Sequence, residues 1–269
     1  MQTNWKKYNG AIIPSTPPHI DIKESREEIK KIVKKHNSLF ARWISDFDCK
    51  RQMSFWYIIN DQMMKINDYS TNTRNQIKKG FKNFQIKKID KSAIIDYGYD
   101  IYSKAFKSYK THLRLKPKKI FCKELEGKWE FWGIFYKNTL IGYSQNKVED
   151  GCCEYSTIKI DPDYQKMYPS YALIFEMNTY YLNERKLNYV SDGTRSIAHH
   201  TDIQEFLIKK FKFRKAFCRI HVLYSTKIKI LVEFLFPFRN VILKINLNLF
   251  QKVGIVLKQE EIIREQMNE

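Results

Sequence analysis

A strand-to-helix turn supplies the first residues that could do chemistry. Residues 154–160 alternate as a strand and stop at Asp161-Pro162, and a helix begins at about Ser170. Pro169 suits the first helical position, where a missing N–H costs nothing. The first N–H groups of a helix lack partners within it and attract anions. We therefore expect this turn to hold a phosphate-bearing ligand, with contacts from Ile160, Gln165, Lys166 and Ser170.

Three side chains near strand ends could accept a proton. Glu154 begins the strand 154–160, and Asp192 ends the next one, where open α/β sheets bind their ligands. His199 lies in a loop before Asp202, and imidazole titrates near neutral pH. Each residue also has a structural interpretation: a solvated strand end for Glu154, a turn or helix cap for Asp192, and a structural loop histidine for His199.

The cysteines predict no site of their own. There are five, an odd number, and none lies in a Cys-x-x-Cys motif. We therefore expect a protein of the reducing cytoplasm, with neither disulfides nor a zinc site. Cys152-Cys153 has no neighbouring histidine in sequence and is interpreted as a pair of ordinary buried or turn thiols.

The elements that must position these residues alternate along the chain. Residues 1–24 are expected to be irregular, because their prolines favour extended backbone. Periodicity and turn residues predict helices over 25–36, 71–84, 94–109, 170–186 and 201–211, and strands over 40–47, 55–59, 85–89, 131–136, 140–143, 154–160, 188–192 and 214–225. This order predicts an α/β fold with a mixed sheet flanked by helices.

Basic side chains are concentrated in three stretches. Residues 71–88, 104–119 and 209–219 carry six, seven and six basic side chains and no acidic ones, which together equal the net charge of +19. If these stretches converge, they suit a polyanion such as a nucleotide cofactor, tRNA or an anionic lipid headgroup. Lysine outnumbers arginine 37 to 11, so codon bias toward lysine is the alternative source of the charge.

The C-terminal part differs in character. Within residues 228–258, apolar residues at helical spacing oppose lysines, which suits either a helix packed on the sheet or an amphipathic helix on a membrane surface. No apolar run reaches 18 residues, and the N-terminus lacks the apolar core of a signal peptide. We expect a cytoplasmic protein, with peripheral contact at the inner face of the membrane left open.

The order of elements resembles that of the GNAT acyltransferases over roughly residues 84–224. Asp161-Pro162-Asp163-Tyr164-Gln165 and the later Ala172-Leu173-Ile174 align with the loop and helix that follow the family's central strand. Residues 206–213 are similar to its later Tyr-x-x-x-Gly-Phe segment. Residues 171–193 and the basic segment 73–79 look like the Fem-type branch, which transfers amino acids from aminoacyl-tRNA.

The resemblance implies a GNAT-like, mostly antiparallel central sheet over residues 84–225. Residues 1–83 would be an N-terminal α/β extension, as a partial second GNAT-like unit, and 226–269 an amphipathic helical extension. It implies N-acyl transfer from acyl-CoA to an amine, such as an amino sugar of a surface polysaccharide precursor, without a metal. Glu154 stands where the family often places its base, and Asp192 and His199 are the other catalytic candidates.

The loop differs from the family pattern, and the donor therefore stays open. Tyr168 and Ser170 replace the two loop glycines, and Pro169 lacks an N–H. The family's tyrosine acid falls at Ile208 and a glycine at Lys212. The alternatives to an acyl-CoA enzyme are a Fem-type aminoacyl transferase using tRNA and a non-catalytic basic binding module.

Overall fold

Contacts divide the chain into two compact units. The computed structural model describes residues 3–8, 10–109, 114–197, 202–245 and 248–268. The first unit comprises Met1–Ile58, Thr194–Asp202 and Lys215–Glu269, and the second comprises Ile59–Gly193 and Ile203–Arg214. Residues 59–83 thus pack with the second unit. The division at residues 83 and 225 stays a prediction from the family resemblance.

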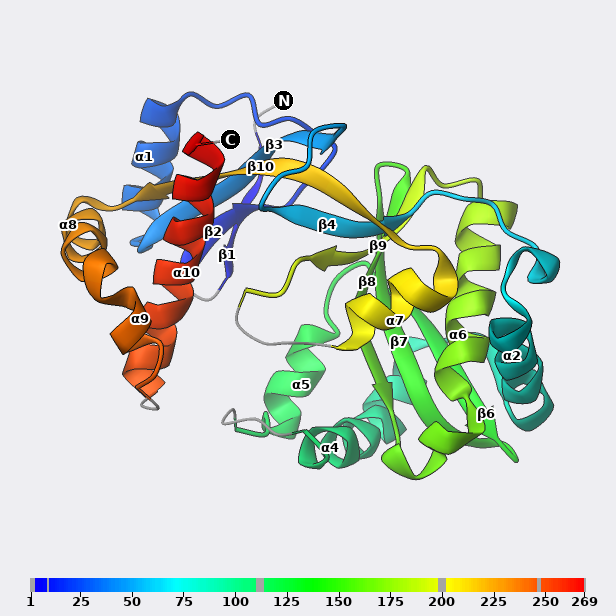
Figure 1. Cartoon of the computed structure of the whole chain (residues 1–269). Helices are drawn as coiled ribbons and strands as arrows, with labels where there is room; N and C mark the ends of the chain where they lie inside the picture. Colours follow the sequence, from blue (N-terminus) through cyan, green and yellow to red (C-terminus); the bar gives the residue numbers. More distant parts are fainter. Residues whose placement is uncertain (1–2, 9, 110–113, 198–201, 246–247, 269) are drawn as a thin grey trace. The chain divides into compact units, whose positions relative to one another are not determined.

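The first unit combines a small mixed sheet with helices (Figure 1). Its elements are β1 (Trp5–Tyr8), β2 (Ala11–Pro14), α1 (Arg26–Lys35), β3 (Phe40–Cys49), the start of β4 (Trp56–Asn60), β10 (Arg214–Tyr224), α8 (Thr226–Leu235), η5 (Phe236–Phe238), α9 (Arg239–Ile242) and α10 (Asn248–Asn268). The strand order is β1-β2-β3-β10, with β2 parallel to β3 and the other two pairs antiparallel.

Two local features of the first unit test the sequence interpretation. Ser25 and Glu28 form the expected capping box, with the Ser25 backbone N–H donating to Glu28 Oε2 at 2.8 Å, so the helix begins as predicted. The expectation of an irregular lead-in was wrong, because β1 and β2 form an antiparallel hairpin there. Pro14 is compatible with a strand at its last residue, where no further ladder N–H is needed.

The second unit carries the central sheet and the predicted site residues. Its elements are η1 (Ile66–Asp68), α2 (Thr71–Asn83), β5 (Gln85–Ile89), α3 (Lys91–Ala93), η2 (Ile94–Gly98), α4 (Tyr99–Lys107), α5 (Lys118–Glu124), β6 (Glu130–Tyr136), β7 (Thr139–Glu149), β8 (Cys152–Ile160), η3 (Pro162–Met167), α6 (Pro169–Asn178), η4 (Thr179–Glu184), β9 (Tyr189–Thr194) and α7 (Asp202–Phe211). The strand order is β9-β8-β7-β6-β5, and only β8 and β9 are parallel.

The β6–β7 hairpin forms as the sequence predicts. Lys137 and Asn138 occupy its turn with φ of 47° and 66°, the left-handed geometry of a two-residue hairpin turn. Their neighbours Tyr136 and Thr139 pair directly, which fixes the register of both strands. The sheet of this unit is therefore mostly antiparallel, as expected.

Consecutive residues of β7 show that helices cover both faces of this sheet. Tyr143 packs with Ile94, Tyr102 and Phe121 of η2, α4 and α5. The next residue, Ser144, belongs to a polar network that reaches Met177 of α6 through Asn146. Since successive strand residues point to opposite faces, α4 and α5 lie on one face and α6 on the other. The short helix α5 was not predicted.

The C-terminal helices are interrupted. The apolar face expected to run along one helix from Ile242 to Val256 is split, because α9 ends at Ile242 and α10 begins at Asn248. Ile242, Val253 and Val256 pack together with Val232 and Leu257 in one core cluster of the first unit. Among the described residues, no helix is both long and apolar enough to cross a membrane.

Candidate active site

The candidate site lies where β8 and β9 separate. Among the described residues, the ladder between the two strands consists of three pairs: Cys152 with Tyr189, Cys153 with Val190 and Glu154 with Ser191. Strand β8 then continues to Ile160 and β9 to Thr194 beyond this ladder. Backbone groups of β8 beyond Glu154 thus have no β9 partner in this ladder, and we call this place the opening between β8 and β9.

A β-bulge marks the same point on the other edge of β8. Thr157 pairs with Gln145 and Tyr155 pairs with Asn146, so Ser156 is the extra residue of β8. The expected strict alternation from Glu154 to Lys159 is therefore broken at Ser156. A bulge leaves one residue outside the ladder and redirects the strand, and bulges are common beside active sites.

Asp192 is the titratable group that the fold perturbs most clearly here. It lies on β9, half-buried, immediately after Ser191. Burial raises the pKa of Asp192 from its ordinary 3.8 to about 7, a hydrogen bond with Gln204 of α7 lowers it, and the charge of Glu154 raises it. A carboxyl group that titrates near neutral pH can take a proton from an amine.

Glu154 has a different environment on the neighbouring strand. Its side chain is exposed, one residue before the buried Tyr155. Within β9, Ser191 Oγ accepts a hydrogen bond from the backbone N–H of Gly193 at 2.9 Å. The structure thus brings Glu154 and Asp192 into one electrostatic environment. His199, the third predicted base, lies outside the described residues.

A buried polar contact that the sequence did not predict lies beneath β8. Tyr155 Oη donates to Asn178 Oδ1 of α6 at 2.8 Å, and both residues are buried. Burial raises the pKa of Tyr155 well above its ordinary value, so the phenol stays protonated. Asn178 also bonds to Tyr69, whose pKa is raised by burial to about 12. These contacts fix α6 against the strand that carries the bulge.

A second polar cluster joins η4 to β6. Trp132 Nε1 donates to Tyr181 Oη at 3.0 Å, and Tyr181 Oη in turn donates to Glu130 Oε2 at 3.1 Å. Lys88 and Arg185 form ion pairs with Glu130 at 3.0 and 2.5 Å. Burial alone would raise the pKa of Glu130, but these two cations hold it below its ordinary value.

The strand-to-helix turn after β8 is anchored by Asp161. This buried carboxylate accepts a hydrogen bond from the Asp163 backbone N–H at 3.1 Å and forms an ion pair with Lys104 of α4 at 2.6 Å. The hydrogen bond from Lys104 to Asp161 raises the pKa of Lys104. The turn is therefore fixed to the helical layer on the α4 face of the sheet.

The residues expected to bind a cofactor share this turn but differ in accessibility. Gln165 and Lys166 are exposed on η3, Ser170 is half-buried at the start of α6, and Ile160 is buried at the end of β8. Pro169 occupies the first position of α6, as predicted. Whether these four residues contact a cofactor stays a prediction.

Helix α2 occupies one side of the same turn. Tyr168 adopts the left-handed conformation with φ of 68°, and a Cβ added to Gly80 of α2 would lie 2.7 Å from the Tyr168 carbonyl oxygen. Asn83 Nδ2 donates to the Met167 carbonyl oxygen at 3.4 Å, and Lys79 Nζ lies 5.8 Å from the Tyr168 ring centroid. These contacts fill space beside the first turn of α6, where the family pattern places glycines.

The neighbouring thiols are structural, as predicted. Cys152 and Cys153 are both buried, and burial raises the pKa of Cys152 to about 11 and that of Cys153 well above its ordinary value. Neither is a thiolate at neutral pH. Within the described residues, no group of three or more His, Cys, Asp or Glu side chains is placed to hold a metal ion.

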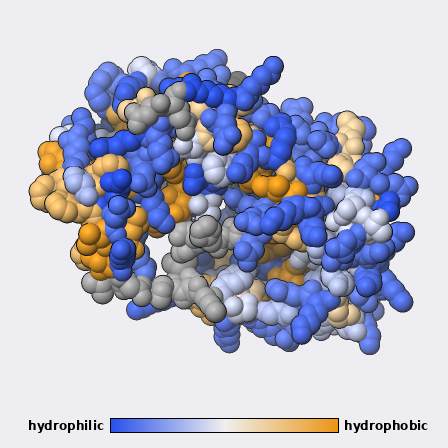
Figure 2. Space-filling model, in the orientation of Figure 1, coloured by the Kyte–Doolittle hydropathy of each residue, from blue (hydrophilic) through white to orange (hydrophobic). Residues whose placement is uncertain are grey.

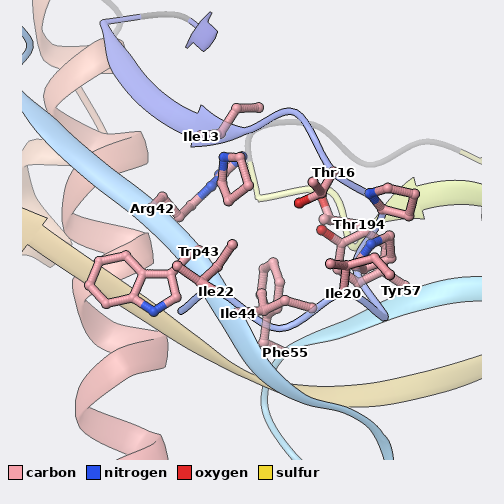
Figure 3. Close-up of a pocket in the computed structure, with 13 residues that line it drawn as sticks. Ile13, Thr16, Ile20, Ile22, Arg42, Trp43, Ile44, Phe55, Tyr57 and Thr194 are labelled. Atoms are coloured by element: carbon pink, nitrogen blue, oxygen red, sulfur yellow. The ribbon is translucent and has the colours of Figure 1, made fainter. Parts of the chain in front are cut away.

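The first unit contains a small cavity of about 70 Å³ (Figure 3). Apolar residues from β2, β3 and the segment after β2 line most of it, together with the charged side chain of Arg42. None of the predicted site residues that the structure describes lines this cavity. Its volume is sufficient for a ligand of only a few heavy atoms. The site considered below is therefore the opening in the second unit.

No protein-family model matches the sequence, and no curated protein matches it. Solved structures do resemble the chain. FemX superposes with a TM-score of 0.59 at 8% identity over 86% of this chain and 85% of that chain. The C-terminal domain of a protein assigned as a lysylphosphatidylglycerol synthetase from Agrobacterium fabrum gives 0.54 at 8% identity over 87% and 86%. L-PGS from Bacillus licheniformis gives 0.51 at 10% identity over 84% and 82%.

These similarities extend over most of each chain. At such low identity they establish the fold. The element order of roughly residues 84–224, which resembled a GNAT domain, corresponds in the structure to β5 through β10. The chain therefore has a GNAT-like fold, shared with FemX and L-PGS.

Proposed function

We propose that this protein transfers an acyl group from an activated donor to an amine at the opening between β8 and β9. The observation that carries the proposal is the position of Asp192. Its carboxyl group, with a pKa of about 7, lies on the strand that borders the opening, beside the charge of Glu154. An amine acceptor is protonated at neutral pH, and such a carboxylate can remove that proton before attack.

The proposed reaction uses the opening in a simple sequence. Asp192 takes a proton from the ammonium group, and the free amine attacks the carbonyl carbon of the donor. Backbone groups around the Ser156 bulge, which stands outside the β7 ladder, would stabilise the developing oxyanion. The attacking nitrogen then gives up its second proton to the leaving oxygen or sulfur as the bond from that atom to the carbonyl carbon breaks. An amide remains, and Asp192 releases the first proton to solvent.

The family resemblance suggests two acyl donors, acyl-CoA and aminoacyl-tRNA. The turn before α6 suits the second of them better. Acyl-CoA would place its pyrophosphate at this turn, where Pro169 supplies no N–H and α2 packs against the Tyr168 carbonyl. Aminoacyl-tRNA does not require that cradle. Lys78, Lys79 and Lys82 of α2 are exposed and could contact a tRNA backbone. We therefore favour aminoacyl-tRNA and retain acyl-CoA as the second donor.

The acceptor is proposed as an amine on the basis of the chemistry of Asp192. An amino sugar of a surface polysaccharide precursor follows from the family resemblance alone. Exposed Gln165 and Lys166 remain the proposed phosphate contacts of either donor. The protein would act in the cytoplasm, where aminoacyl-tRNA and acyl-CoA are both present.

A donor-consumption assay tests this function. Radiolabelled aminoacyl-tRNA or acetyl-CoA would be incubated with the full chain and a panel of amines that includes amino sugars. We expect amine-dependent loss of one donor, and a 10²- to 10⁴-fold lower rate for Asp192→Asn. Asp100→Asn, at an exposed carboxylate on α4, is the matched control and should retain the rate. Consumption of neither donor above the buffer rate would reject the proposal.

A further inference from the structure

Helix α8 of the first unit is apolar on two sides. One side, formed by Ile228, Val232 and Leu235, packs in the cluster that contains Ile242 and Leu257. These positions recur at helical spacing, so they form the face that α8 needs for folding. A helix at the surface of a water-soluble unit normally carries polar residues on its other side.

The other side of α8 carries large apolar side chains in solvent. Ile230 is 63% exposed, Leu231 45% and Phe234 69%, and the apolar surface continues past η5. We refer to these exposed apolar residues together as the outer apolar surface: Ile230, Leu231, Phe234, Phe238, Val241 and Leu243. Figure 2 shows hydrophobic surface, in orange, over α8 and α9. The rings of Phe234 and Phe238 lie 6.3 Å apart, so the surface is continuous across η5.

Contiguous exposed apolar surface usually marks a binding surface. Isolated exposed apolar residues occur elsewhere in this chain, for example Tyr97 and Ile120. The outer apolar surface differs because six such residues fall within residues 230–243. It contains a phenylalanine pair beside aliphatic side chains, a composition typical of helices that lie in a membrane interface.

Charge around the outer apolar surface indicates what covers it. Lys227, Lys229 and Lys244 border it and are exposed. The acidic residue of α8, Glu233, lies 3.8 Å from Lys229, and Arg239 forms an ion pair with Glu261. In the part of the chain that the structure describes, Lys227 and Lys244 form no ion pair. The border is therefore basic and complements anionic headgroups.

We propose that the outer apolar surface docks on an anionic lipid bilayer. The apolar side chains would enter the boundary between headgroups and acyl chains, and the lysines would contact the headgroup phosphates. A second copy of the chain fits less well, because a two-fold contact would bring the same lysines together. This inference is independent of the proposed acyl transfer and needs no acyl donor.

Vesicle co-sedimentation of the full chain tests the proposal. We expect binding to vesicles with about 30% phosphatidylglycerol in phosphatidylcholine, weaker binding to phosphatidylcholine alone, and loss of the difference at high salt, where the charges are screened. The variant Ile230→Ser/Phe234→Ser/Phe238→Ser should lower the partition coefficient at least about tenfold, because the side chains that enter the bilayer are removed. Lys227→Glu/Lys244→Glu should lower it on anionic vesicles by roughly fivefold or more per lysine.

Two matched controls separate docking from general stickiness and charge. Met63→Ser/Tyr97→Ser/Ile120→Ser removes three apolar side chains exposed by 61%, 62% and 48% in the second unit and should leave vesicle binding unchanged. Lys31→Glu/Lys34→Glu changes the net charge equally on α1 and should have a much smaller effect. Thermal melting checks that every variant folds, which we expect because the replaced residues are exposed.

The outcome that overturns the proposal is equally defined. Either absence of binding to anionic vesicles or an equal reduction of binding in the test and control variants would reject it. Sedimentation velocity addresses the rival occupant. A dimer in the wild type that the triple serine variant dissolves, without vesicle binding, would assign the surface to a second copy and contradict the lipid proposal.

Discussion

Glu154 and Asp192 lie on neighbouring parallel strands, and the charge of Glu154 adds to the rise that burial causes in the pKa of Asp192. Glu154 pairs with Ser191, and Asp192 is the next residue of β9. The ladder ends at this pair, which is where the sheet opens. A charge held at the edge of the opening thus tunes the group that we propose as the base.

The raised pKa of Asp192 has a consequence for stability. A carboxyl group whose pKa is raised on folding binds its proton more tightly in the folded state, so stability falls as pH rises from about 3.8 to about 7. We predict that Asp192→Asn is more stable than the wild type at pH 8, by about 1–3 kcal/mol after allowance for solvent screening. Urea unfolding at pH 8 and pH 4 measures this, and the difference should nearly vanish at pH 4. Equal stability at pH 8 would show that Asp192 is not perturbed by burial.

Gly80 lies against the turn at the start of α6. Alanine is normally the better helix former by about 1 kcal/mol. Here its Cβ would lie 2.7 Å from the Tyr168 carbonyl oxygen and 3.0 Å from Ala172 Cβ. We predict that Gly80→Ala lowers the free energy of unfolding by about 1–3 kcal/mol through overpacking. Asn75→Ala, exposed on the same helix, is the control. A stabilising Gly80→Ala would mean that α2 does not hold this turn closely.

The exposed lysines of α2 allow a test of the donor. If aminoacyl-tRNA is the donor, filter binding of tRNA should weaken steeply with salt. Replacing Lys78 and Lys82 by alanine should reduce the slope of log K against log salt by about 1 for each phosphate that is no longer neutralised. Lys31→Ala/Lys34→Ala on α1 provides the control. An unchanged slope would show that α2 does not touch the tRNA, and acetyl-CoA binding in its place would favour the second donor.

Local sequence patterns predicted much of the central sheet. The Lys137-Asn138 turn, the strand ending at Ile160 and Pro169 at the start of α6 depend on neighbouring residues, and all are present as expected. The β1–β2 hairpin was missed because four-residue strands carry little periodicity and the prolines nearby indicated a loop. The β8–β9 opening could not be predicted, because its position depends on which strands pair and in what register, and local sequence patterns do not determine that pairing.

The chemical environment of the site needed the tertiary structure. Asp192 was chosen as a strand-end carboxylate, but its pKa depends on burial and on Gln204 from a later helix. The Ser156 bulge is visible only in the shift of register against β7. The contact between Tyr155 and Asn178 joins residues 23 apart in sequence, so the local sequence around either residue does not predict it. The roles of Glu154, Gln165, Lys166, Ser170 and Ile160 stay predictions.

The pH dependence of acyl transfer tests the central claim most directly. With saturating amine, kcat/KM for the donor that is consumed should rise with pH through an apparent pKa near 7, as Asp192 loses its proton. Glu154→Gln should move this pKa downward, because it removes the neighbouring negative charge. Asp192→Asn should abolish this rise of kcat/KM with pH and lower the rate by 10²- to 10⁴-fold. An unchanged profile in both variants would contradict the assignment of Asp192 as the base and of the β8–β9 opening as the active site.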